Sequence, residues 1–163
     1  MEPQNPVTAA SDTLRILVVG NNPIELSRLL TRIQQINDKK VVIETAFDMQ
    51  SILSRLEKFK PDFILLDDNL GRSELRQVVK ALHHAKETRG TPITVLKNSN
   101  YTEAIGGGVL DYLLKETLTG DSLYRALRNS LKFRKTQQYL YMAYKKRKGQ
   151  LLRIFKSEPA FQI

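Results

Sequence analysis

The sequence predicts an α/β fold: a doubly wound, five-stranded parallel sheet with helices on both faces. Five short apolar runs, each bounded by polar residues, Gly or Pro, are typical of strands buried on both faces. They are residues 16–19, 41–43, 63–66, 93–96 and 112–114. Segments between these runs and after the last one carry apolar residues at helical spacing. This alternation of strand and helix indicates crossover connections, and therefore parallel strands.

Composition limits the classes of protein that fit. A chain of 163 residues with 41% apolar residues is one globular domain with room for one appended element. The absence of cysteine excludes disulfides and thiolate metal sites. Residues 1–13 are polar, resemble no signal peptide, and are expected to be a flexible leader. No apolar run is long enough to cross a bilayer, so we expect a cytoplasmic protein that has no membrane contact.

The net charge of +9 is concentrated at one end of the chain. Residues 1–121 carry 15 Lys and Arg against 16 Asp and Glu, whereas residues 122–163 carry 11 against one. The predicted globular part is therefore almost neutral and is followed by a basic segment.

The first three helices have recognisable starts. Asn22 followed by Pro23 and Glu25 predicts an N-cap, a first helical residue and a capping box. Asp48 is expected to cap the second helix, and the third follows Gly71.

The last two helices differ greatly in strength. A helix at residues 102–105 is the weakest expectation, because residues 106–108 are all glycine. The final helix is predicted to open at Thr119 and to continue to about Lys148, with Gly149 as its first break. At 1.5 Å per residue this helix would be about 45 Å long, so part of it must project or pack on another molecule.

The third apolar run ends in the polar sequence Asp67-Asp68-Asn69. At the carboxyl end of a central parallel strand, such residues stand where open α/β sheets bind ligands. The alternative is an ordinary polar turn, which Asp, Asn and Gly also favour.

Four segments together resemble the receiver domain of bacterial response regulators. They are ILVVGNNP at 16–23, PDFILLDDNL at 61–70, TPITVL at 91–96 and DYLLK at 111–115. The resemblance covers residues 14–131 and leaves the leader and a basic helical extension, residues 132–163, unexplained. It implies a flavodoxin-like fold with strand order 2-1-3-4-5 and a switch point between strands one and three. Gly20 and Asn21 would then lie beside Asp67 and Asp68.

The resemblance also implies a chemistry, the transfer of a phosphoryl group from a phosphohistidine to a carboxylate. In the family, two acids after strand one, the acceptor, and a backbone carbonyl two residues later hold Mg²⁺. A Lys after strand five pairs with the phosphoryl group, and a Thr or Ser at the end of strand four carries the switch. Carried over, Asp67 matches the acceptor, Asn69 the carbonyl ligand and Lys115 the lysine. Tyr112 matches the switching aromatic residue.

Several positions depart from the family pattern. The two acids fall on Gly20 and Asn21, followed by Asn22, and the switch hydroxyl falls on Lys97. The usual prolines after strand three and after the lysine are Gly71 and Glu116. These changes predict an atypical receiver, or pseudo-receiver, with a weak metal site or none, for which Asp67 and Asn69 would be the remaining ligands. We hypothesise that Lys97 and Lys115 clamp Asp67 and Asp68 without a metal.

The basic segment leaves three interpretations open: a solvated helix face, a nucleic-acid contact, or a helix that binds a partner or dimerises. The third is favoured here, with the charge selecting an acidic protein surface. Its central cations are Arg134, Lys135, Lys145, Lys146, Arg147 and Lys148.

Three functions follow from these observations. The first is a non-enzymatic signalling module of a two-component or phosphorelay system that acts by protein contact, for example with a histidine kinase or a phosphotransfer protein. The second is a conventional regulator phosphorylated on Asp67. The third is a receiver-fold nucleic-acid binder that uses residues 125–156.

Overall fold

The computed structural model describes residues 13–98 and 111–157. Its strands are β1 (Thr13–Val19), β2 (Lys40–Ala46), β3 (Phe63–Asp67), β4 (Ile93–Lys97) and β5 (Asp111–Leu114). Its helices are α1 (Pro23–Gln34), α2 (Met49–Leu56), α3 (Arg72–His84) and α4 (Gly120–Ser157), with a 3₁₀ turn, η1 (Asp68–Leu70), directly after β3. The predicted leader and the weak helix at 102–105 lie outside the described residues, apart from Thr13, which opens β1.

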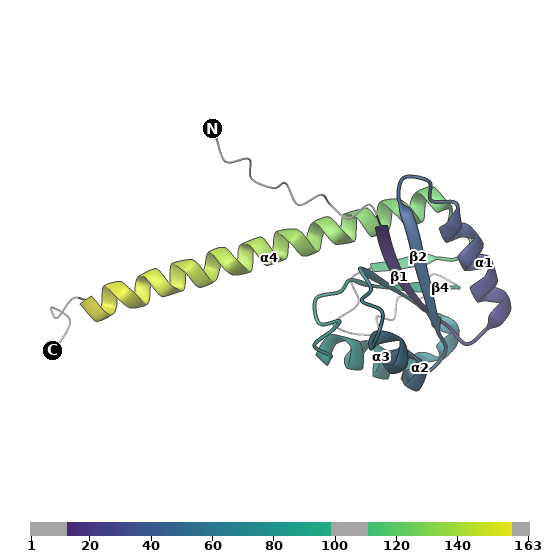
Figure 1. Cartoon of the computed structure of the whole chain (residues 1–163), viewed down its shortest axis with the longest axis horizontal. Helices are drawn as coiled ribbons and strands as arrows, with labels where there is room; N and C mark the ends of the chain where they lie inside the picture. Colours follow the sequence, from purple (N-terminus) through teal and green to yellow (C-terminus); the bar gives the residue numbers. More distant parts are fainter. Residues whose placement is uncertain (1–12, 99–110, 158–163) are drawn as a thin grey trace.

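All five strands are parallel and lie in the order β2-β1-β3-β4-β5 (Figure 1). The predicted α/β class and the strand order implied by the receiver resemblance are therefore confirmed. β2 lies on one side of β1 and β3 on the other, so the order in which strands are added to the sheet reverses at β1. There Ile16 pairs in register with Phe63, and Val19 pairs with Leu66. This is the switch point of the sheet, and the carboxyl ends of both strands emerge side by side there.

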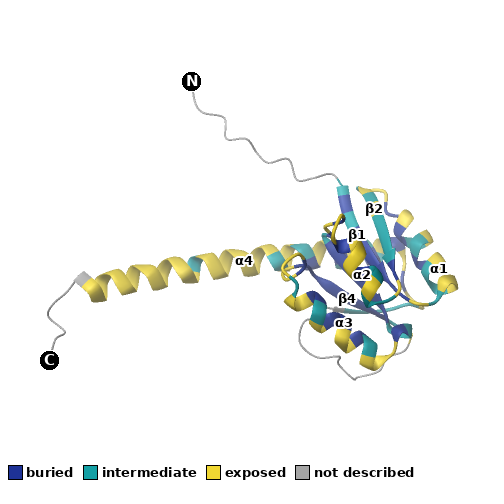
Figure 2. Ribbon diagram, turned by 60° about the horizontal axis from the view of Figure 1, so that its bottom comes forward, coloured by how far each residue is buried: buried dark blue, intermediate teal, exposed yellow. Residues whose placement is uncertain are grey.

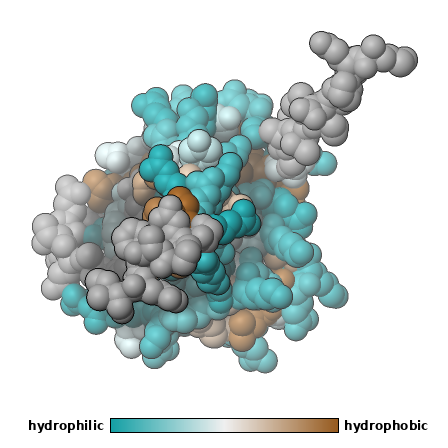
Figure 3. Space-filling model, turned by 90° about the vertical axis from the view of Figure 1, so that its left-hand side faces the viewer, coloured by the Kyte–Doolittle hydropathy of each residue, from teal (hydrophilic) through white to brown (hydrophobic). Residues whose placement is uncertain are grey.

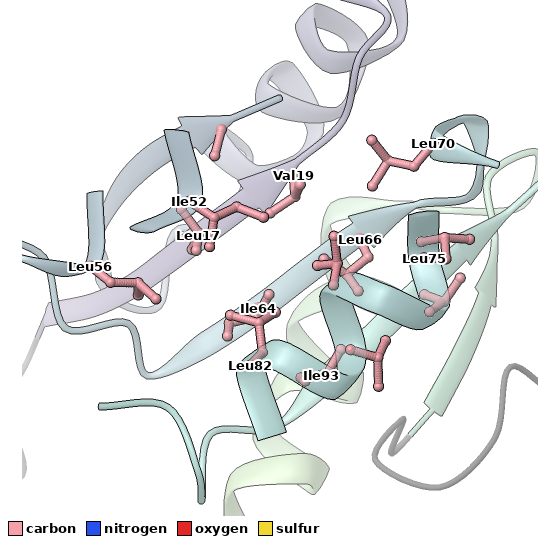
Figure 4. Packing of buried hydrophobic residues seen from close by; sticks show 14 of the residues in the cluster. Leu17, Val19, Ile52, Leu56, Ile64, Leu66, Leu70, Leu75, Leu82 and Ile93 are labelled. Atoms are coloured by element: carbon pink, nitrogen blue, oxygen red, sulfur yellow. The ribbon is translucent and has the colours of Figure 1, made fainter. Parts of the chain in front are cut away.

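The sheet separates two hydrophobic cores because successive strand residues point to opposite faces. Leu17 and Leu66 belong to the core under α2 and α3, which Figure 4 shows with Ile52 and Leu82 packed onto the strands. Ile16 and Leu65 belong to the opposite core, which α1 and the first turns of α4 cover. Each of the three central strands is therefore buried on both sides, as their continuous apolar runs predict.

The helix starts follow the predicted caps. The Asn22 side chain accepts hydrogen bonds from the amides of Ile24 and Glu25, at 3.0 and 3.3 Å. Asp48 and Ser51 form a complete capping box on α2. Thr119 caps α4, since its hydroxyl accepts a bond from the Ser122 amide at 3.1 Å.

The last helix, α4, is one continuous element that leaves the domain and extends away from it (Figure 1). Its 38 residues correspond to about 57 Å. The predicted break at Gly149 is wrong, because the helix runs through this residue to Ser157. A single exposed glycine costs a helix only about 1 kcal/mol relative to alanine, which good helix formers on either side offset. Within the described residues, no helix is both long and apolar enough to span a membrane.

Candidate functional site

The candidate site lies at the carboxyl edge of the sheet, where β1, β3 and β5 end. Asp67 is the last residue of β3, and its side chain is almost completely buried. Gly20 directly follows β1 and is packed so closely that a Cβ there would lie 3.1 Å from the Asp67 Cβ. The polar residues at the end of β3 therefore belong to a buried pocket edge rather than to an ordinary surface turn.

Lys115, which follows β5, places its ammonium among three carboxylates. Its Nζ lies 2.5 Å from Asp67 Oδ1, 3.3 Å from Asp68 Oδ1 and 3.9 Å from Glu25 Oε2. The lysine side chain is only 13% exposed, so the pair with Asp67 is shielded from water on both sides. An ion pair in such surroundings holds its partners far more firmly than a surface pair does, because solvent screens it less.

Backbone and side-chain amide groups also hold this cluster of polar side chains in place. The amide of Asn69 donates to Asp67 Oδ1 at 2.9 Å within η1. The amide of Asn98 donates to Asp68 Oδ2 at 2.9 Å, and the Asn98 side chain donates to Asn69 Oδ1 at 3.0 Å. The segment that follows β3 is thus tied to the segment after β4 by the side chains of Asp68, Asn69 and Asn98 and by the backbone amide of Asn98.

Lys97 has a different neighbour from the one its sequence position suggests. Its ammonium lies 4.3 Å from the centre of the Tyr112 ring, a cation–π contact between the neighbouring strands β4 and β5. The ion pairs that the structure records for Asp67 and Asp68 come from Lys115. The structure therefore contains the Lys115 half of the hypothesised clamp and shows Lys97 holding Tyr112.

Glu25 was given only a capping role from the sequence, but it belongs to this site. Its carboxylate turns toward Lys115 and toward Arg28, 3.8 Å away, rather than back to the start of α1. The signal that could have revealed it is its position in the first turn of a helix that begins right after β1. That turn must lie at the same edge of the sheet as the ends of β1 and β3.

Arg32, which lies about two helical turns after Glu25 on α1, also reaches this edge. Its Nη1 donates to the carbonyl of Lys115 at 2.5 Å and so fixes the loop that carries the lysine. Arg32, Glu25, Asp67 and Lys115 share the wall of a cavity of about 250 Å³. Of the other sequence-predicted pocket residues, Asn21 is exposed and Asn22 is occupied as the cap of α1.

The donor set at this edge does not fit Mg²⁺, which requires several hard oxygen ligands in octahedral array. Position 20 has no side chain, and position 21 offers one exposed neutral amide. Asp67 and Asp68, the remaining acids at the end of β3, both already pair with the Lys115 ammonium. In the described part of the chain, no three acidic or histidine side chains converge in a way that could hold a metal.

The basic residues of the C-terminal segment lie along α4. Arg134 is half-buried, and its guanidinium packs against Gly90 of the domain. The cations further along, Lys135, Lys145, Lys146, Arg147 and Lys148, are all exposed (Figure 2). The candidate site and these cations are therefore separate features of the molecule.

With this geometry, the fold is that of the response-regulator receiver domains. The signal receiver domain of an HD domain-containing protein from Pseudomonas fluorescens superposes with a TM-score of 0.66 at 19% identity, over 83% of this chain and 98% of that one. The receiver domain of a sensor histidine kinase from Pseudomonas aeruginosa, which has a magnesium ion in its active-site cleft, gives a TM-score of 0.62 at 19% identity, over 74% and 98%.

The chemotaxis response regulator CheY4 of Vibrio cholerae gives a TM-score of 0.59 at 23% identity, over 72% of this chain and 98% of that one. No family model and no curated protein sequence matches the chain. The similarity therefore lies in the fold, which spans nearly the whole of each receiver domain and leaves part of this chain uncovered.

Proposed function

We propose that this chain is a receiver-type signalling module whose pocket is held in one state by ion pairs, and which acts by protein contact rather than by catalysis. The observation that carries the proposal is that Gly20 and Asn21 follow β1 where the family has two acids, so that the ion pairs recorded for Asp67 and Asp68 are those with Lys115. Asp67 is the match to the family's phospho-acceptor, and an acceptor carboxylate needs a cation to offset the charge that develops on the phosphoryl oxygens.

Three features support the loss of a metal-dependent switch. The two positions that would add acidic ligands are Gly20 and Asn21, so the pocket draws a divalent cation less strongly. A metal would also have to displace a shielded ammonium from Asp67. Finally, Lys97 occupies the position of the switch hydroxyl and contacts Tyr112 instead.

The test is a titration of the full chain with Mg²⁺ and beryllofluoride, followed by NMR. The amides of Asn69 and Asn98 are suitable reporters, since each donates to one of the two carboxylates. We expect no saturable shift of either amide up to about 10 mM Mg²⁺, a concentration at which an ordinary carboxylate magnesium site is filled. Ca²⁺ without beryllofluoride, at matched ionic strength, controls for general screening.

A saturable shift that disappears in the Asp67→Asn variant would overturn the proposal in favour of a conventional regulator phosphorylated on Asp67. That alternative has one observation on its side, since Asp67 stands at the end of β3 with a lysine beside it. Incubation with a small phosphodonor and measurement of the intact mass gives an independent readout: the proposal expects no added phosphoryl group.

A further inference from the structure

The outer half of α4 extends beyond the domain, and most of its side chains are exposed. From Lys135 to Lys156 every residue is exposed except Ala143, which is half-buried (Figure 2). The last contact with the domain that the structure records for the helix is that of Arg134 with Gly90. Hydrophilic residues dominate the side of the molecule from which the helix projects, and hydrophobic ones form only small separate patches there (Figure 3).

Four large apolar residues form a stripe along this exposed helix. They are Phe133, Leu140, Tyr144 and Leu151, with exposed fractions of 48%, 60%, 62% and 55%. Their spacings of seven, four and seven residues place them within roughly 40° of one another around the helix axis. A row of side chains this regular is typical of a helix face that packs against another surface.

The stripe is not a continuation of the face that packs on the domain. That face is formed by Leu123 and Leu127, which are 0% and 1% exposed. At about 100° per residue, these two residues point roughly 100° away from the centre of the stripe. A second surface is therefore needed to cover the stripe.

The charge of the helix indicates what that surface is. From Phe133 to Ser157 the sequence contains eight Lys and Arg and no Asp or Glu. A second copy laid along the stripe would bring two such arrays together with no acidic residue on either flank, whereas paired helices use opposite charges there. A second copy of this chain is therefore disfavoured, and an acidic surface is favoured.

The position of Arg147 favours a protein partner over a lipid surface. It lies between Tyr144 and Leu151 and points within roughly 40° of the stripe centre. When the stripe is covered, its guanidinium is covered with it, and a buried guanidinium needs a carboxylate to pair with. A protein groove can supply that carboxylate, but acyl chains cannot. The far side of the helix carries further cations, which would point away from a membrane on which the stripe rests.

We infer that the stripe of Phe133, Leu140, Tyr144 and Leu151 is the docking surface for an acidic protein partner, which presents an apolar groove with a carboxylate facing Arg147. The inference deepens the proposed function, because it assigns the protein contact to a surface and a partner chemistry. The recognition mode is a helix lying in a groove, with affinity from the stripe and selectivity from the surrounding cations.

The test uses the full chain and a synthetic, fluorescently labelled helical peptide as the probe. The peptide has Leu and Ile along one face, Glu on both flanks and one Glu within the apolar face. Binding is measured by anisotropy at about 150 mM salt, where the weakest surface attraction is screened. We expect saturable binding, and at least roughly tenfold weaker binding of a peptide with Lys in place of every Glu.

Matched variants of the chain then locate the contact. Leu140→Ser with Leu151→Ser removes two stripe residues and should weaken peptide binding roughly tenfold or more. Met142→Ser with Leu152→Ser removes two equally exposed apolar residues away from the stripe and should leave binding within about twofold. Far-UV circular dichroism verifies that both variants retain the helix.

The charge is tested in the same way. Arg147→Gln should weaken peptide binding severalfold, while Lys146→Gln, which removes the same charge away from the stripe, should have a smaller effect. The inference would be overturned if the double variant on the stripe and the double variant away from it lost the same amount of peptide affinity. It would also be overturned if the Glu peptide did not bind.

Other occupants are identified by parallel measurements. Stripe-dependent binding to phosphatidylserine vesicles or to duplex DNA, tighter than binding to the Glu peptide, would assign the helix to a membrane or a nucleic acid instead. Stripe-dependent self-association in sedimentation would assign it to a second copy. The Asp67→Asn variant should bind the peptide like the wild type. Failure of peptide binding thus refutes the docking surface alone, whereas a saturable response of Asn69 and Asn98 to Mg²⁺ and beryllofluoride refutes the proposed pocket state alone.

Discussion

The Lys97 ammonium lies 4.3 Å from the centre of the Tyr112 ring and joins the carboxyl end of β4 to β5. In the strand register Lys97 pairs with Leu114 and Tyr112 pairs with Val95, so the two side chains are diagonal neighbours on one face of the sheet. A cation over an aromatic ring in a half-buried setting contributes about 0.5–1 kcal/mol. The contact therefore favours one position of the Tyr112 ring.

A double-mutant cycle measures this contact. We expect Lys97→Met, which keeps most of the stem, and Tyr112→Leu each to lower the free energy of unfolding. The coupling between them should be about 0.5–1 kcal/mol in urea denaturation. The cycle removes the other interactions that Lys97 makes, because those are lost equally with either residue at position 112. A coupling energy near zero would contradict the role assigned to the pair.

Most of the fold could be predicted from the sequence, and the reason is visible in β1 and β3. Their apolar runs are continuous because both faces of each strand are covered, and they end abruptly at Gly20 and Asp67, where the site begins. Asn22 and Asp48 marked the helix starts because a cap is a local interaction, read within four residues.

The site could be predicted only in part. The position of Asp67 at the carboxyl edge follows from topology, but the partner of each charge depends on side-chain directions that the sequence does not encode locally. Lys97 was therefore expected beside Asp67, whereas its ammonium lies over Tyr112. Glu25 was given a local capping role, whereas it contributes to the surroundings of Lys115, 90 residues away in the sequence.

Removal of the Lys115 charge should destabilise the fold strongly. In Lys115→Met the buried Asp67 carboxylate loses its ammonium partner, and we expect the free energy of unfolding to fall by about 3 kcal/mol. Adding Asp67→Asn to this variant should recover part of the loss, because the unpaired charge is then removed. Urea unfolding followed by circular dichroism measures both variants. A double variant less stable than Lys115→Met alone would show that Asp67 does not depend on the lysine.

The tight packing at Gly20 predicts that an acid cannot simply be restored there. A Cβ at this position would lie 3.0 Å from Leu26 Cδ2 and 3.1 Å from the Asp67 Cβ. We expect Gly20→Ala to lower stability by about 1–2 kcal/mol through overpacking. Gly20→Asp should lower it further, because a second carboxylate is then placed next to Asp67. Thermal unfolding compares them with Asn21→Asp, an exposed control expected to stay close to wild type, and a neutral Gly20→Ala would refute the packing argument.

Asp48 predicts a pH dependence of stability. Hydrogen bonds from the backbone amide and the hydroxyl of Ser51 hold the pKa of Asp48 below its ordinary value. A carboxyl with a lowered pKa stabilises the fold when ionised, so its contribution is present above about pH 4 and is lost as the pH falls through the lowered pKa. Asp48→Asn keeps the capping oxygen but does not titrate.

The stability difference between wild type and Asp48→Asn should therefore shrink as the pH is lowered from about 5 to about 2. Urea midpoints measured across this range for both proteins give the comparison, and the other acidic groups cancel because both proteins share them. A difference that is constant across the range would mean that the ionised Asp48 carboxylate does not contribute to the cap.

Gly149 predicts how firmly the outer part of α4 is held as a helix. The residue lies within the continuous helix, and no atom beyond its neighbours lies within 4 Å of where its Cβ would be. Gly149→Ala should therefore stabilise the helix by about 1 kcal/mol without any steric cost, since alanine loses less conformational freedom on folding. In this variant the amides of Lys148 and Gln150 should be better protected from hydrogen exchange. Their Cα chemical shifts should move toward the values of a fully formed helix.

Gly149→Pro should have the opposite effect on the helix. Proline removes a backbone hydrogen-bond donor and clashes with the preceding turn, which destabilises the helix by about 3 kcal/mol. It should separate the segment before residue 149 from Leu151 and so weaken peptide binding by the stripe, while Gly149→Ala strengthens it or leaves it unchanged. If proline at this position left peptide binding intact, Leu151 would not act together with Leu140 and Tyr144 on one continuous helix face.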